Sequence, residues 1–203
     1  YIDVVNAMYA NHNPGQREAV PCWMIFDSRY RKNTVIGGAV YPATMMPDSL
    51  VPKHYWNDLI YKGDTLSALA HQIGVDAQNL QQTVMRFNRF AQSGVDEDFK
   101  RGGNAADRYY SSPASKPNPN VGALEQGPFY AVRVVAGDIG TKGGLLTNAD
   151  AQVLREDGSV IDGLYACGNC SAAVMGRSYA GAGSTLGPAM TFGFVAAETA
   201  SRL

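Results

Sequence analysis

The chain has 203 residues and a mass of 21.7 kDa, enough for one or two domains with a buried core. Charged residues make up 17% of the sequence, below the usual share of about 25%, which argues against a disordered chain. The net charge is −1 and the pI is about 6.3, so the sequence lacks the basic excess that binding to a phosphate backbone requires. We therefore expect no nucleic-acid partner.

The first residues show helical spacing of apolar side chains, at Ile2, Val5, Met8 and Tyr9. The sequence begins with Tyr1 rather than Met, and it shows neither a signal peptide nor an apolar run of 18 residues. Because the chain starts inside an amphipathic pattern, we expect it to be the later part of a longer protein.

Residues 21–27 predict a buried strand, because a short apolar run ends there in polar residues. Residues 32–56 are irregular and punctuated by glycine and proline, yet they carry many apolar side chains. A loop of this composition either packs over a core or lines an apolar cavity, and the sequence favours neither alternative.

Two helices are predicted next. The first begins at Asp64-Thr65 and ends at Gly74, and the second covers residues 77–92 and ends at Gly94. Five apolar residues are expected on the inner face of the second helix: Leu80, Val84, Phe87, Phe90 and Ala91. Residues 93–128 are polar and then rich in Gly, Ser, Asn and Pro, which is typical of a surface segment or a crossover between domains.

The remaining elements are strands followed by one helix. Alternating or short apolar runs predict strands over 129–135, 145–147, 152–154 and 164–166, and the chain from Gly183 to Arg202 predicts a helix. The cysteines at 22, 167 and 170 are odd in number, which suggests reduced thiols and a cytoplasmic protein. Cys167 and Cys170 form a CxxC without a second ligand pair, so we expect packed thiols and no metal site.

Glycine is concentrated near the end of the chain: 12 of the 22 glycines follow residue 136. A glycine-rich loop, residues 176–183, leads into the N-terminus of the last helix, where unpaired N–H groups favour an anion or a polarised carbonyl. The loop fits neither a P-loop nor GxGxxG. A tight structural connection is the alternative to a binding role.

Five segments, in order, resemble one family. The segments are residues 21–27, 127–132, 140–145 (Gly-Thr-Lys-Gly-Gly-Leu), 163–169 and 178–193. They resemble the fumarate reductase/3-ketosteroid dehydrogenase superfamily of FAD flavoproteins, and the last segment is similar to its 3-ketosteroid Δ1-dehydrogenase branch. The fumarate reductase branch would have His and Arg where this chain has Gly140 and a Tyr–Gly pair.

The resemblance implies an α/β (α+β) fold. Residues 1–127 would form a catalytic (substrate) domain that is incomplete at its N-terminus, and residues 128–203 the C-terminal part of a Rossmann-like FAD-binding domain. The GxGxxG turn for the ADP half of FAD is absent. We therefore expect a remaining N-terminal FAD-binding polypeptide, from the same gene or a partner chain, and no activity from the fragment alone.

The resemblance also implies a reaction, the 1,2-desaturation of a 3-ketosteroid substrate. Tyr179 and the Gly183 N–H would bind the C3 carbonyl and so favour enolisation at C2. Tyr1 would take the C2 proton, a hydride would pass from C1 to flavin N5, and an external acceptor would reoxidise the flavin. Tyr9 is the alternative base, although its spacing with Val5 favours core packing.

For the cofactor, the resemblance implies that Gly168 and Asn169 approach the ribityl–pyrophosphate of FAD. Ser184, Thr185 and Leu186 would present backbone N–H groups to the flavin pyrimidine oxygens. Three alternatives stay open: a Δ4-(5α)-dehydrogenase or other enone oxidoreductase, a fumarate-reductase-like enzyme, and a non-catalytic chain that completes another subunit. We expect a cytoplasmic protein, with peripheral membrane association as a further alternative.

Overall fold

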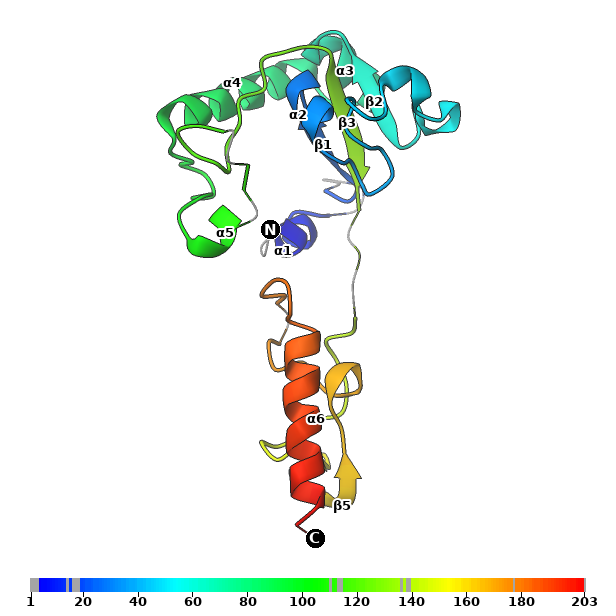
Figure 1. The fold of residues 1–203 in the computed structure, drawn as a ribbon, viewed down its shortest axis with the longest axis vertical. Coiled ribbons are helices and arrows are strands. Elements are labelled where there is room, and N and C mark those ends of the chain that lie inside the picture. Colours follow the sequence, from blue (N-terminus) through cyan, green and yellow to red (C-terminus); the bar gives the residue numbers. More distant parts are fainter. Residues whose placement is uncertain are drawn as a thin grey trace. The chain divides into compact units, whose positions relative to one another are not determined.

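A computed structural model describes residues 4–13, 15, 19–109, 111–112, 115–135, 137, 140–176 and 178–202. The chain divides into two compact units, one formed by residues 21–135 and the other by residues 1–20 together with 136–203. Figure 1 labels most of their helices and strands. Helices and small antiparallel sheets occur together, which confirms the mixed α and β content predicted from the sequence. The assignment of residues 1–127 and 128–203 to a substrate domain and a flavin domain stays a prediction.

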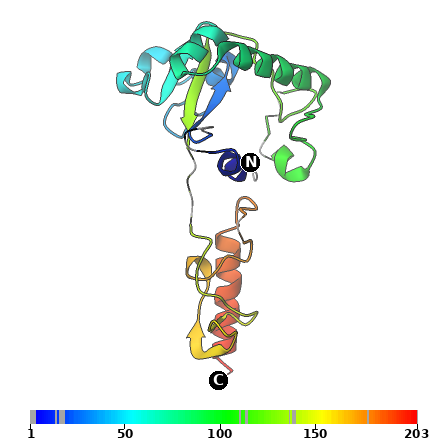
Figure 2. The same ribbon diagram turned by 180° about the vertical axis from the view of Figure 1, so that it is seen from behind.

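The unit of residues 21–135 is built on a three-stranded antiparallel sheet with the order β1-β3-β2. Figure 2 shows β1 in blue beside β3 in yellow-green. Its strands are β1 (Cys22–Phe26), β2 (Ile60–Gly63) and β3 (Phe129–Val134). Met24 lies opposite Val132, and Tyr61 lies opposite Ala131. Because β3 pairs with both other strands, it belongs structurally with residues 21–135.

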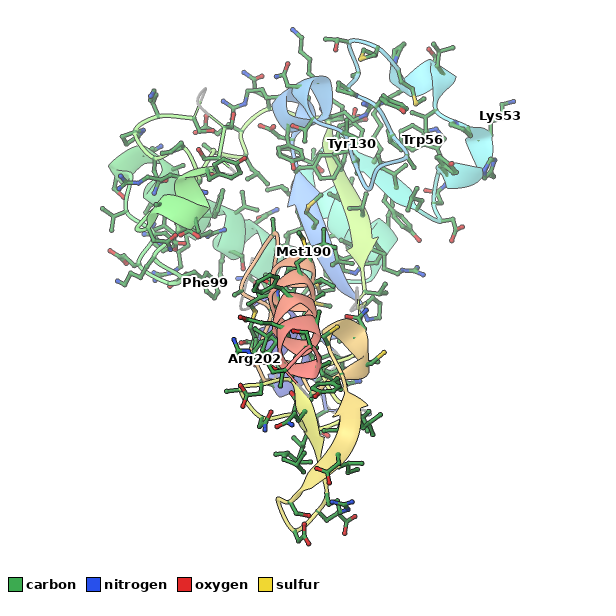
Figure 3. The ribbon with its side chains drawn as sticks, turned by 60° about the horizontal axis from the view of Figure 1, so that its bottom comes forward. Lys53, Trp56, Phe99, Tyr130, Met190 and Arg202 are labelled. Atoms are coloured by element: carbon green, nitrogen blue, oxygen red, sulfur yellow. The ribbon has the colours of Figure 1, made fainter. Side chains whose placement is uncertain are left out.

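The two faces of this sheet bury different clusters, as the period of two in a strand requires. One cluster contains Phe26, Ile60, Tyr130 and Val132, and Trp56 packs against it (Figure 3). The other contains Tyr61 and Ala131 from the sheet, together with Leu69 and Ile73 from a helix. Both clusters therefore depend on the central strand β3.

The described residues of this unit form the helices α2 (Ser28–Asn33), α3 (Leu66–Ile73), α4 (Ala77–Ser93) and α5 (Ala105–Tyr109). The side chains of Thr65 and Asp76 cap α3 and α4, and Gly74 and Gly94 end them in the left-handed conformation. The two predicted helices are thus confirmed, and the polar segment after them contains α5, which the sequence did not predict. Val84, Phe90 and Ala91 are buried on α4.

Part of the apolar segment of residues 37–56 packs over the core, whereas Met45 and Leu50 stay exposed. Val40 and Val51 are buried in the first cluster, and short 3-10 turns form at Asp48–Leu50 and Lys53–Tyr55. Arg31, with 1% of its surface exposed, donates to the carbonyl oxygens of Tyr41 at 2.7 Å and Met46 at 2.6 Å. A buried guanidinium therefore ties this segment to α2.

The other unit has fewer regular elements. It contains α1 (Val4–Ala10), a hairpin of β4 (Gln152–Leu154) and β5 (Val160–Tyr165), a 3-10 turn η3 (Gly168–Cys170) and α6 (Leu186–Ala200). The strand expected at 164–166 begins earlier, and the helix expected from Gly183 begins at Leu186. None of the described residues of α6 is buried, and Met190 is 73% exposed (Figure 3).

Within the described residues, no helix combines the length and the apolar character that crossing a lipid bilayer would require.

Candidate active site

Two backbone segments lie side by side beneath the predicted site. Leu145 N–H donates to the Cys170 carbonyl at 3.0 Å, and Ala172 N–H donates to the Leu145 carbonyl at 2.9 Å. Residues Leu145 and Ser171 form a parallel bridge. Residues 141–145 are therefore fixed against residues 169–173, although about 25 residues of chain separate them.

The glycines of residues 140–144 permit this close approach. A Cβ on Gly144 would lie 2.5 Å from the Ser171 carbonyl carbon of the main chain, and one on Gly140 would lie 2.8 Å from the side-chain Nδ2 of Asn169. Neither position accepts a side chain without displacement of its neighbour. Part of the high glycine content thus serves the packing of backbone on backbone.

Gly168 follows β5 and lies against α6. Its φ of +65° is left-handed, and a Cβ there would meet the Ala189 Cβ at 3.3 Å. The next residue, Asn169, is exposed, and its carbonyl oxygen accepts a hydrogen bond from the Thr141 hydroxyl at 3.2 Å. Both predicted cofactor residues therefore sit where the end of β5, residues 140–141 and α6 converge.

The loop before α6 exposes backbone. Gly181 has a φ of +121° and Gly183 a φ of +89°, and no atom lies within 4 Å of the position of either Cβ. A flat ligand can therefore approach the main chain at both positions. Side chains at these two glycines would both strain the backbone and fill this space.

The start of α6 retains unpaired donors. The N–H groups of Ser184 and Gly187 donate within the loop, to the carbonyls of Gly181 at 3.1 Å and Gly183 at 2.8 Å. In the part of the chain that the structure describes, the Thr185 and Leu186 N–H groups have no acceptor, and Thr185 makes no side-chain cap. Two of the three predicted flavin donors are thus available, and the third, Ser184, is engaged inside the loop.

Tyr179 lies in the same loop and is half-buried. The Nζ of Lys142 lies 5.4 Å from the centroid of its ring, in cation–π range. The sequence did not predict this contact. The available signal was a lysine that precedes two glycines, in a segment that resembles a family motif.

The structure describes Tyr9 and not Tyr1, the two candidate bases. Tyr1 lies outside the described residues. Tyr9 on α1 is 62% exposed, whereas Met8 beside it is 6% exposed. The expectation that Tyr9 packs in the core was therefore wrong for this chain, because Met8 faces the interior instead.

The three cysteines are free thiols, with Cys170 exposed and Cys22 and Cys167 half-buried. Among the described residues, no group of three or more His, Cys, Asp or Glu side chains is placed to hold a metal ion.

Known proteins of related sequence match this chain over most of its length. A 3-oxosteroid 1-dehydrogenase of Mycobacterium tuberculosis is 47% identical over 201 residues, which are 97% of this chain and 35% of that protein. A 4-oxocyclohexanecarboxylate 2-dehydrogenase of Sinomonas cyclohexanicum is 50% identical over 143 residues, 70% of this chain and 25% of that protein. The chain thus spans about a third or less of the length of these relatives.

A solved structure is also similar over the whole chain. The 3-ketosteroid Δ1-dehydrogenase of Sterolibacterium denitrificans, in complex with 1,4-androstadiene-3,17-dione, matches with a TM-score of 0.90 and 50% identity. The match covers 100% of this chain and 35% of that protein. Residues 1–186 match the family described as FAD binding domain. The chain therefore belongs to the FAD binding domain family of flavoproteins.

Proposed function

We propose that this chain is part of an FAD-dependent dehydrogenase that introduces a C1–C2 double bond into 3-ketosteroids. The observation that carries the proposal is the loop of residues 178–187. It brings a half-buried tyrosine, two glycines with open backbone and a helix start with unpaired N–H groups into one stretch. The names of the relatives, which act on 3-oxosteroids, support the choice of substrate.

The residues present fit the flavin end of FAD. Thr185 and Leu186 offer unpaired N–H groups at a helix N-terminus, where an electron-rich ligand is stabilised by the helix dipole. Gly168 lies against the same helix, and Asn169 lies against residues 140–141. The N–H and hydroxyl of Ser184 both donate to the Gly181 carbonyl, so Ser184 would have to release that carbonyl to join the set that holds the cofactor. FAD supplies a hydride acceptor when it is bound. The remaining N-terminal polypeptide would hold its ADP half.

The chain's own groups would act on the ketone. The Tyr179 hydroxyl and the Gly183 N–H would donate to the C3 carbonyl oxygen, and these donors stabilise the negative charge that develops when the C2 proton leaves. Tyr1 would accept that proton, with Tyr9 as the alternative. A tyrosine has an ordinary pKa near 10, so either base requires a neighbour that stabilises the phenolate.

The full-length flavoprotein that contains this sequence provides the test. Tyr179→Phe removes one donor to the carbonyl, and we expect Δ1-desaturation of a 3-keto-4-ene steroid to fall by about 100-fold or more. The variant should keep its flavin absorbance at about 450 nm, because Tyr179 is assigned to the substrate and not to the cofactor. The control is Tyr30→Phe, because Tyr30 is half-exposed and is far from Tyr179 in the sequence. Unchanged turnover in Tyr179→Phe would contradict the proposal.

A second comparison separates the candidate bases. We expect Tyr1→Phe to abolish solvent exchange of the C2 hydrogen while Tyr9→Phe preserves it. The reverse result would move the role to Tyr9.

A smaller cyclic ketone is a second candidate substrate, because the Sinomonas relative acts on 4-oxocyclohexanecarboxylate. The same carbonyl grip and the same adjacent desaturation would serve it. Parallel measurement of kcat/KM with a 3-ketosteroid and with 4-oxocyclohexanecarboxylate decides between them, and we expect the steroid to be preferred.

A further inference from the structure

Backbone hydrogen bonds fix the position of the Lys142 main chain. Its carbonyl oxygen accepts from the Ala173 N–H at 3.0 Å, and three residues later Leu145 is bonded to both Cys170 and Ala172. These hydrogen bonds hold the two segments together, and the absence of a side chain at Gly144 lets its backbone lie directly against Ser171. Lys142 therefore has a fixed origin only a few residues from the loop that carries Tyr179.

From that origin, the ammonium group reaches the ring of Tyr179. Nζ lies 5.4 Å from the ring centroid, and both side chains are half-buried. The two residues belong to the same compact unit, so their contact is independent of how the units are arranged. Half-burial removes part of the water that would otherwise screen the charge.

Other described cations of this stretch serve their own elements. Arg155 donates to Ser159 and Val160 inside the β4–β5 hairpin, and Arg202 pairs with Glu198 one turn away on α6. Lys142 instead directs its charge at the aromatic ring that the proposed function places on the substrate carbonyl. This difference in partners points to a role at the site.

We propose that Lys142 is a positioning residue for Tyr179, an inference that rests on the proposed function. Its ammonium group holds the ring in the orientation that aims the hydroxyl at the ketone oxygen. By stabilising the electron-rich ring, it also strengthens the hydrogen bond that the Tyr179 hydroxyl donates to the oxygen where negative charge develops during enolisation. Lys142 acts through Tyr179 and does not itself bind the substrate.

The test uses Lys142→Met in the full-length flavoprotein, because methionine keeps most of the side-chain volume and removes the charge. We expect kcat for 3-ketosteroid desaturation to fall about 10- to 100-fold with KM changed less than about threefold, since the charge acts mainly in the transition state. Lys142→Arg should restore most of kcat, because a guanidinium also stacks on aromatic rings. Arg155→Met, in the same unit, should leave kcat unchanged.

A binding measurement supplies a readout that is independent of turnover. A steroid with a phenolic A ring mimics the enol form of the substrate, and its binding to the oxidised enzyme is followed through the flavin absorbance. We expect Lys142→Met to weaken this phenolic ligand at least fivefold while it leaves the affinity for a 3-keto-1,4-diene steroid nearly unchanged. In a Tyr179→Phe background, Lys142→Met should have no further effect on either ligand.

The outcomes are distinguishable. Wild-type protein that does not desaturate 3-ketosteroids overturns the proposed function and this inference together. Active wild-type protein with an equally active Lys142→Met variant overturns the inference alone. Loss of flavin from Lys142→Met, or an equal effect in the Tyr179→Phe background, also overturns it, because Lys142 would then act on the cofactor or the fold and not through Tyr179.

Discussion

The two regions on either side of residue 136 are stabilised in different ways. Residues 21–135 contain every cluster of buried apolar side chains found among the described residues, namely the two on the sheet and a third formed by Phe90, Ala91 and Val121. They also contain the buried charged residues Asp27, Arg31 and Asp96. Among the described residues of 136–203, only Ala151, Val153 and Ala166 are buried apolar residues. The first region is organised by a core. The second is organised by backbone hydrogen bonds, and it carries almost all the predicted site residues.

The helix α6, in the second region, exposes large apolar side chains. Leu186, Met190 and Phe194 lie at successive intervals of four along it and are 69%, 73% and 71% exposed. A helix as apolar as this one is normally covered by protein. Since this chain spans 35% of its 3-oxosteroid relatives, we expect these side chains to be buried in the full-length flavoprotein. Four predictions test this difference between residues 21–135 and residues 136–203. Both tryptophans, Trp23 and Trp56, lie in the first region, so tryptophan fluorescence follows its unfolding.

Removal of Arg31 should have the largest effect. Its Nε lies 3.2 Å from Asp48 Oδ1, and it also holds the carbonyls of Tyr41 and Met46. Arg31→Met leaves these acceptors unpaired, so we expect the first region to lose about 3–5 kcal/mol of unfolding free energy in urea, followed by tryptophan fluorescence. Lys62→Met removes the more exposed partner of Asp48 and should cost about 1 kcal/mol or less. Equal losses would contradict the assignment.

Core truncation should give the next largest effect. Ile60 is fully buried in the first cluster, and Ile60→Ala should cost about 2–5 kcal/mol. The control is Phe194→Ala on α6, where the exposed ring should cost about 0.5 kcal/mol or less in the 203-residue chain. In the full-length flavoprotein we expect Phe194→Ala to become much more costly. A small cost in both proteins would show that α6 stays uncovered.

Acid should destabilise the first region selectively. Burial would raise the pKa of Asp27, but hydrogen bonds from the Tyr30, Glu125 and Gln126 N–H groups and from Arg29 outweigh it and lower that pKa below 3.8. Because the folded pKa is depressed, the stabilisation is present above the ordinary pKa and is lost as the pH falls through the folded value. We expect the urea midpoint to fall between about pH 5 and about pH 2.

Two variants isolate this carboxylate. Asp27→Asn should flatten the acid dependence of the urea midpoint. Asp157→Asn, in the exposed β4–β5 turn, should leave it unchanged, since Asp157 lies outside the core region. An unaltered pH dependence in Asp27→Asn would assign the effect to the other buried acids.

A glycine on α6 should show the smallest effect. No atom lies within 4 Å of the position of a Gly187 Cβ, so Gly187→Ala fits the helix and should stabilise it by up to about 1 kcal/mol, measured from helical circular dichroism on heating. If the flavin packs against this part of the main chain, the same variant of the full-length protein should release FAD more readily. Destabilisation of the isolated chain would contradict the open space seen at Gly187.

Local signals in the sequence predicted the local elements. The helix start at Asp64-Thr65, the cap at Asp76 and the terminal glycines defined α3 and α4, although Thr65 and not Asp64 caps α3. An apolar run defined β1. The order β1-β3-β2 was beyond such signals, because β3 follows its two partners by many residues. The start of α6 was predicted too early, because residues 183–185 form a turn in which Gly183 takes a positive φ.

The site was predictable in part for the same reason. The resemblance identified Tyr179 and the glycines around it, whereas the contact with Lys142 requires two distant segments to be paired through Gly144. Arg31 holds the apolar loop through the carbonyls of Tyr41 and Met46. Nothing in the sequence around it distinguishes this buried arginine from the more exposed Arg29.

The pairing of residues 141–145 with 169–173 has a practical consequence. The β4–β5 hairpin leaves this pair and returns to it, and its turn at Glu156, Asp157 and Gly158 is exposed. A change in the length of the turn therefore need not move either segment of the pair. This turn is therefore a suitable internal position for a peptide tag or a fluorophore, for purification or imaging of the flavoprotein.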